Sequence, residues 1–224
     1  MRYGDPEGAM RRWREGWKEL QENLPDEVDT FEGAQEAFGK AFPNVQNWMW
    51  DVLNTGRGLA TKNPDRVAPA VDFAEEFLAG FGGESGELRG AIQAELAYFI
   101  GRAGRIEAAE EICRRLIDEQ PEQARGYCTL ADVYLGAEPP ELSRALEILE
   151  EAVEYPVKDP EDWDLTRRID QVRRDLRMKE ARESEHFVEW KTFWDDFEKA
   201  ELDEKLAPHP DLAVGFADAL RNQG

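Results

Sequence analysis

The sequence predicts an all-α protein, and three observations lead to that prediction. Apolar residues recur every three or four positions along most of the 224 residues, which is the period of an amphipathic helix. β-Branched residues are sparse and never alternate with polar residues as they would in a strand. Prolines and glycines separate the apolar stripes from one another. We therefore expect helices along the chain and essentially no sheet.

Two helices are expected in the first 43 residues. The first begins at Asp5-Pro6 and ends at Pro25, because proline is favoured in the first turn of a helix and disrupts its interior. Asp29 and Glu32 have the spacing of a capping box and begin the second, which Pro43 ends. The two apolar stripes consist of Met10, Trp13, Trp17, Leu20 and Leu24, and of Phe31, Ala34, Phe38 and Phe42.

Two further helices are expected before residue 84. The third has an open end, because Gly56 and Gly58 both lower helix propensity. The fourth begins either at Asn63-Pro64 or near Pro69. A loop of glycines, from Gly80 to Gly86, follows it. The apolar stripes are Val45, Trp48, Met49, Val52 and Leu53, and Val71, Ala74, Phe77, Leu78 and Phe81.

Residues 90–157 contain two successive segments with the offsets of a 34-residue helix-turn-helix repeat. In the first, Ala97 and Ala109 are small residues that let two antiparallel helices approach, Gly104 stands at the turn and Pro121 near the end. The second begins near Ala124 and carries about two inserted residues around 136–140. Its packing residues are Tyr127, Leu130, Ala131, Tyr134, Ala145, Leu149 and Ala152. Both segments resemble tetratricopeptide repeats.

The resemblance implies an array of helix pairs, an α-α superhelix, that binds a peptide or helix in a concave groove lined by the first helix of each pair. Such a chain is a non-enzymatic interaction scaffold or adaptor. Tyr98 and Arg102 are the strongest expected contacts, because an aromatic ring and an arginine can anchor a partner. The remaining groove positions are Ala94, Arg125, Cys128 and Asp132. The lysines and asparagines that similar repeats use to clamp a terminal carboxylate are absent, which disfavours chaperone-tail binding.

The C-terminal part is predicted to contain a long helix. Leu165, Ile169, Val172 and Leu176 follow coiled-coil spacing, and the same register resumes at Phe187, so residues 160–204 form one helix or two nearly collinear ones. This stripe could support a homodimer. A final helix over residues 211–222 caps or docks onto the array. We therefore expect three regions. Residues 1–84 form an N-terminal helical region that either consists of degenerate repeats or is unrelated to them, since the small-residue positions cannot be aligned onto residues 44–81. Residues 85–158 form the two repeat-like helix pairs, and residues 159–224 form the long helix or helix pair and the short final helix.

Composition and charge limit the partners. A net charge of −21 disfavours nucleic acid and anionic membrane, and makes a basic protein or peptide the easier partner to imagine. The arginine-rich stretch 167–182 is expected to form internal salt bridges, although an anion site is the alternative. No signal-peptide core or membrane-length apolar run occurs, so a cytoplasmic location is expected.

Catalytic and metal motifs are weak. Cys113 and Cys128 lack zinc-site spacing; Cys113 is expected in the core, whereas Cys128 could be exposed in the groove. Glu183-x-x-His186 has the spacing of a di-iron motif, but only one copy exists. We expect no cofactor, no metal and no enzymatic activity. The alternative is a metal- or ligand-binding helical protein, or an enzyme, with its site around Glu183 and His186.

Overall fold

The computed structural model describes residues 6–39, 45–83, 86–155, 157–158, 163–184 and 191–192. Two compact units, Met1–Asp175 and Leu176–Gly224, are treated separately below. The helices are α1 (Pro6–Asn23), α2 (Phe31–Phe38), α3 (Val45–Lys62), α4 (Ala68–Gly80), α5 (Gly86–Arg102), α6 (Ile106–Glu119), α7 (Ala124–Leu135), α8 (Leu142–Glu154) and α9 (Leu165–Glu183). Within these described ranges there is no strand, only an isolated bridge between Gln123 and Lys158. The all-α prediction is confirmed.

The first helices begin close to the predicted positions, but α2 ends at Phe38 with Gly39 as its cap, before the predicted end at Pro43. Its start also needs a correction. The cap of α2 is Thr30 rather than Asp29: the Thr30 hydroxyl accepts a hydrogen bond from the Gly33 backbone N–H at 3.1 Å. Between α3 and α4, Pro64 begins a short 3₁₀ turn and Pro69 lies in the first turn of α4, so each proline begins a helical segment. The expected glycine loop is shorter than predicted, because α4 includes Gly80 and α5 starts at Gly86.

Gly56 does not end α3, which continues through it to Lys62. A Cβ atom at Gly56 would lie 2.8 Å from the Ala70 Cβ on α4 and 3.0 Å from the Phe99 ring on α5. The missing side chain is therefore what allows three helices to approach at this point. Gly58, two residues later, has no heavy atom within 4 Å of such a Cβ. The low helix propensity of the first glycine is thus offset by packing.

An aromatic core joins α1, α2, α3 and α4. The Trp17 ring is buried and stacks on the Phe77 ring with their centroids 4.3 Å apart, and Phe31 of α2 packs on Phe81 at the same separation. Trp48 of α3 lies 6.3 Å from Trp17. Such pairs contribute about 0.5–1.5 kcal/mol each beyond the area they bury.

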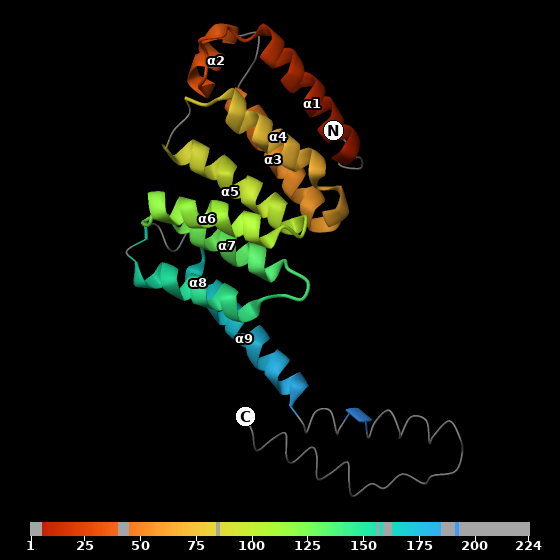
Figure 1. Cartoon of the computed structure of the whole chain (residues 1–224), viewed down its shortest axis with the longest axis vertical. Coiled ribbons are helices and arrows are strands. Elements are labelled where there is room, and N and C mark those ends of the chain that lie inside the picture. The colour runs from red at the N-terminus through yellow and green to blue at the C-terminus, as the bar shows by residue number, and fades with distance from the viewer. Residues whose placement is uncertain are drawn as a thin grey trace, which may run out of the picture. The chain divides into compact units, whose positions relative to one another are not determined.

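The helices from α3 to α8 pack in the order of the chain, as Figure 1 shows for the segments from orange to green. α5 packs on α6 and α7, and α6 packs on α7; in the same way, α3 and α4 both pack on α5. The five small residues expected at close helix contacts are completely buried: Ala97, Ala109, Ala131, Ala145 and Ala152. Because these side chains are small, the helix backbones can approach closely.

The start of α9 packs into the first unit. Leu165, Ile169 and Val172 are buried, so the first half of the predicted stripe is already covered within the chain. Arg173 of α9 bonds Glu150 of α8 at 2.7 Å, which confirms that part of the arginine-rich stretch pairs with neighbouring helices. In the second unit, α9 continues to Glu183, and Met178 is exposed. The rest of 160–204 and the helix expected at 211–222 lie outside the described residues.

None of the helices in the described ranges is long and apolar enough to cross a bilayer.

Candidate functional site

Tyr98, the first predicted contact, packs inside the protein rather than projecting from it. Only 9% of the residue is exposed. The Arg57 guanidinium of α3 lies 4.3 Å from the centroid of its ring, and its hydroxyl is 3.1 Å from the Thr61 Oγ1. A cation over an aromatic face and a hydroxyl contact both hold α5 against α3. Tyr98 is therefore a packing residue that stabilises the contact between α5 and α3.

Arg102, the second predicted contact, joins the ends of three helices. Its Nε donates to the Ala60 carbonyl in the last turn of α3, and its Nη1 donates to the Gly136 carbonyl just after α7, each at 3.2 Å. Cationic side chains at helix C-termini satisfy carbonyls that have no partner within the helix. A Cβ at Gly136 would lie 2.7 Å from the Arg102 Nη1, so only glycine leaves room for this contact. Arg102 thus has a structural role here.

Asp132, a third predicted residue, stands at the centre of four charged side chains from four different helices. Its Oδ2 is 3.2 Å from the Arg57 Nη2 of α3, and its Oδ1 is 2.8 Å from the Arg168 Nη1 of α9. Arg57 also contacts Glu95 of α5, with its Nη1 2.7 Å from the Glu95 Oε1. We call this row, Arg57, Glu95, Asp132 and Arg168, the charge ladder. It places α3, α5, α7 and α9 along one face.

Within the charge ladder, the charged form of Arg168 is favoured and the charged form of Glu95 is disfavoured. Burial raises the pKa of Glu95, and the attraction of Arg57 only partly offsets it. The Glu95 Oε2 is buried and has no hydrogen-bond partner among the described residues. Burial opposes the charge on Arg168 as well, but Asp132 together with Cys128 and Asp164 more than offsets that effect, so the pKa of Arg168 is raised. The Arg168 guanidinium therefore stays charged, whereas the charged form of Glu95 is disfavoured.

Arg125 and Cys128 lie beside the charge ladder on α7. The Arg125 side chain is partly exposed, with its Nη2 3.6 Å from Glu87 and its guanidinium 5.4 Å from the Trp163 ring centroid. Cys128 is buried, so the expectation that it could be exposed is wrong. Burial raises the pKa of Cys128 to about 11, and that of Cys113 to about 12. Both thiols are protonated at neutral pH and are poor nucleophiles.

Ala94, the remaining predicted groove residue, is buried as well. Of the predicted set, the structure brings Tyr98 and Asp132 together around Arg57, whereas Arg102 lies among the helix ends. The sequence missed Arg57, because residues 44–81 could not be aligned with the repeat pattern. Arg168 belonged to a stretch that was expected to pair internally. A search for arginines at matching positions of successive first helices could have found both.

The alternative site around Glu183 gains no ligand set from the described residues. Glu183 lies 3.9 Å from Lys179 one turn earlier on α9, an ordinary exposed pair. His186 lies outside the described residues. Across the part of the chain that the structure describes, no group of three or more His, Cys, Asp or Glu side chains could hold a metal ion.

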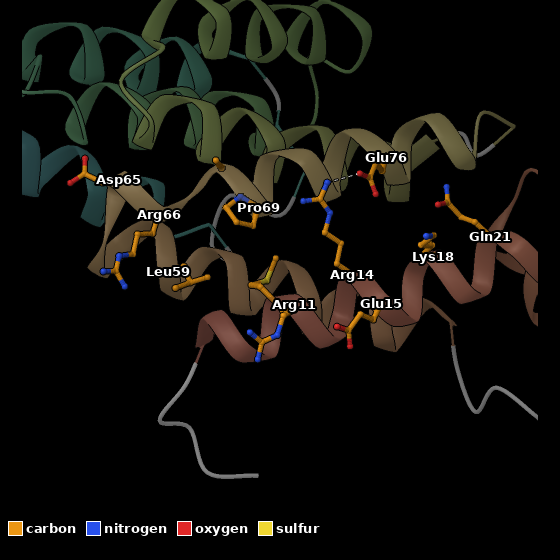
Figure 2. Close-up of a pocket in the computed structure, with 12 residues that line it drawn as sticks. Arg11, Arg14, Glu15, Lys18, Gln21, Leu59, Asp65, Arg66, Pro69 and Glu76 are labelled. Carbon is orange, nitrogen blue, oxygen red and sulfur yellow. Dashed lines mark hydrogen bonds and ion pairs between the residues drawn. The ribbon is translucent and has the colours of Figure 1, made fainter.

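A groove of about 830 Å³ lies between α1 and the segment from Asp65 to Glu76. Figure 2 shows Arg14 reaching across it from α1 to Glu76 of α4. The Arg14 Nη2 is 2.8 Å from the Glu76 Oε1, and its Nη1 is 3.2 Å from Asp72. Arg14 is therefore paired with both acids. This groove was not predicted from the sequence.

Comparisons with known proteins identify no family or relative for this chain. No family model matches the chain, and no curated protein or solved structure is significantly similar to it.

Proposed function

We propose that this protein is a non-enzymatic interaction scaffold whose α3–α9 helices form a tetratricopeptide-like array. The packing order supports this, since α3 and α4 both contact α5, and α5 and α6 both contact α7. α9 is joined to the last pair by side chains, because Arg168 reaches α7 and Arg173 reaches α8. The array is then wider than the two pairs of the sequence resemblance, with α3 before them and α9 after them.

The charge ladder is the observation that carries the proposal. Four successive first helices of the array present their side chains on one face, which is the arrangement that helical-repeat proteins use to bind an extended peptide or a helix. Arg57 and Arg168 remain partly exposed there, with side-chain exposures of 41% and 32%. Arginine is enriched among the residues that contribute most to protein interfaces. We call the surface formed by the charge ladder and Arg125 the ladder face.

A displayed peptide library tests whether the ladder face binds protein segments. Random peptides of about 12 residues, long enough to fill a repeat groove, are selected on the full-length chain. The enriched peptides are then measured against Arg57→Glu and Arg168→Glu by fluorescence anisotropy. Each substitution is expected to weaken binding about tenfold, the cost of losing a well-placed charged contact at an interface.

The control is Arg114→Glu. Arg114 also forms an exposed ion pair between two helices, with Glu151, but it joins α6 to α8 and lies off the charge ladder. Peptides that bind wild type and Arg114→Glu equally, and both ladder variants more weakly, support the proposal. If no peptide is enriched, or if the enriched peptides bind both ladder variants as tightly as wild type, the ladder face is not the binding surface.

A further inference from the structure

The two arginines of the charge ladder lie nearer to solvent than its two carboxylates. The Arg57 and Arg168 side chains are 41% and 32% exposed, whereas the Glu95 and Asp132 side chains are only 19% and 22% exposed. Arginine is also a much longer side chain, so an equal exposed fraction presents more surface. A partner that approaches the charge ladder therefore meets its guanidinium groups before it meets its carboxylates.

These guanidinium groups keep hydrogen-bonding capacity. A guanidinium carries five N–H donors in a fixed fork. Toward the described residues, Arg168 uses one donor, to Asp132, and Arg57 uses two, to Glu95 and Asp132. The remaining donors suit the bidentate pairing that arginine makes with carboxylates. Because Asp132 holds both arginines, their positions are fixed before any partner arrives, which lowers the entropic cost of binding.

The local charge differs from that of the chain. The chain has a net charge of −21, yet the charge ladder is balanced, with Arg57 and Arg168 against Glu95 and Asp132. Arg125 beside it is paired with the exposed Glu87. Burial also favours the neutral form of Glu95, as its raised pKa indicates. At the charge ladder, contact with a partner is therefore made first by the guanidinium groups of Arg57 and Arg168. Net charge acts over long distances and is screened by salt, so contact is governed by the local charge.

We propose that the ladder face binds an acidic segment of a partner protein, whose Asp or Glu side chains pair with Arg57 and Arg168. This inference rests on the proposed scaffold function. It assigns an acidic partner to the scaffold, whereas the net charge alone favours a basic one. A long phosphate polymer fits poorly, because its many charges would face the surrounding acidic surface. A short acidic segment carries only a few carboxylates, and all of them pair with the arginines.

Two matched helical peptides test the inference on the full-length protein. Both have about 16 residues, share one leucine stripe and have blocked ends. They differ only in carrying Glu or Lys at the remaining, non-leucine positions. Blocked ends remove terminal charges, so only side chains are tested. We expect the Glu peptide to bind more tightly than the Lys peptide in anisotropy titrations. Arg57→Gln and Arg168→Gln should each weaken Glu-peptide binding about fivefold, as for a partly exposed charged contact.

Two further variants separate recognition from a loss of structure. Arg114→Gln removes an equally exposed arginine elsewhere and should change binding less than about twofold. Arg57→Lys keeps the charge but loses the fork, so it should recover part of the affinity lost in Arg57→Gln. Circular dichroism checks that each variant melts near the wild-type temperature; a variant that unfolds is replaced by Arg125→Gln, on the same face.

The inference is overturned if the Lys peptide binds more tightly, or if the arginine variants leave Glu-peptide binding unchanged. It also fails if neither peptide binds while library peptides still depend on Arg57 and Arg168; in that case the scaffold function stands and its partner is not acidic. If neither peptide binds and the library yields nothing, both proposals fall.

Discussion

Alanine at Gly56 and alanine at Gly58 should have opposite effects on stability, although the two glycines lie only two residues apart on α3. At Gly58 the added Cβ meets no heavy atom within 4 Å, so the substitution gains only helix propensity, about 1 kcal/mol. At Gly56 the same gain is opposed by a Cβ placed 2.8 Å from the Ala70 Cβ, which no side-chain rotation can move away. Overpacking of this kind costs about 1–3 kcal/mol.

The expected free energies of unfolding follow from these values. Gly58→Ala stabilises by about 1 kcal/mol, and Gly56→Ala destabilises by about 1–2 kcal/mol, because the contact at 2.8 Å lies toward the upper end of the overpacking range. Urea unfolding monitored by circular dichroism measures both, and melting temperatures should differ by several degrees, at about 2–4 °C per kcal/mol for a chain of this size. Equal stabilisation by the two alanines would refute the close approach of α3, α4 and α5 at Gly56.

Three further predictions concern the charge ladder and the core. Because the folded-state pKa of Glu95 is raised, its contribution to stability is present in acid and is lost as the pH rises above about 4.5, its ordinary pKa. The stability of Glu95→Gln relative to wild type should therefore grow between pH 4 and pH 7 in urea titrations. A constant difference would contradict the burial of this carboxylate. Cys113 and Cys128 should react with a thiol reagent at pH 8 far more slowly in the native protein than in urea, and fast native labelling of either would show that its helix contact is open. Ile169→Ala should cost about 2 kcal/mol or more and speed amide exchange in α9 before α5, whereas uniform exchange would show that α9 does not pack as a separate end of the first unit.

The sequence predicts the helices well because their causes are local. Stripes of apolar residues, and prolines such as Pro25 and Pro69, act within one or two turns, so the bounds of α1 and α4 agree with the expectation. Gly56 shows where local reasoning fails. Helix propensity made it a candidate helix end, but its role depends on Ala70 and Phe99, one of which is 43 residues away along the chain. Tertiary contacts override propensity there.

The candidate site was only partly predictable for a related reason. Tyr98 and Asp132 follow from the repeat register, and both contact Arg57 of the charge ladder. Arg57 does not follow, because its helix lacks the small-residue pattern that defines the register. The prediction for Cys128 was also wrong. The register places Cys128 toward the groove, but the residue is buried, because burial depends on the packing of other elements as well as on the register. A pattern within one repeat carries no information about its neighbours.

The reach of Arg57 has a consequence for how the protein unfolds. In a simple helical array, each element touches only its immediate neighbours, so the ends can fray independently and unfolding is nearly one-dimensional. Arg57 contacts Asp132 across the intervening α5, and Asp132 contacts α9 in turn. Such a next-nearest connection penalises the opening of one end while the other is intact. The denaturation curve of the first unit should accordingly be steeper than a nearest-neighbour array of the same length allows.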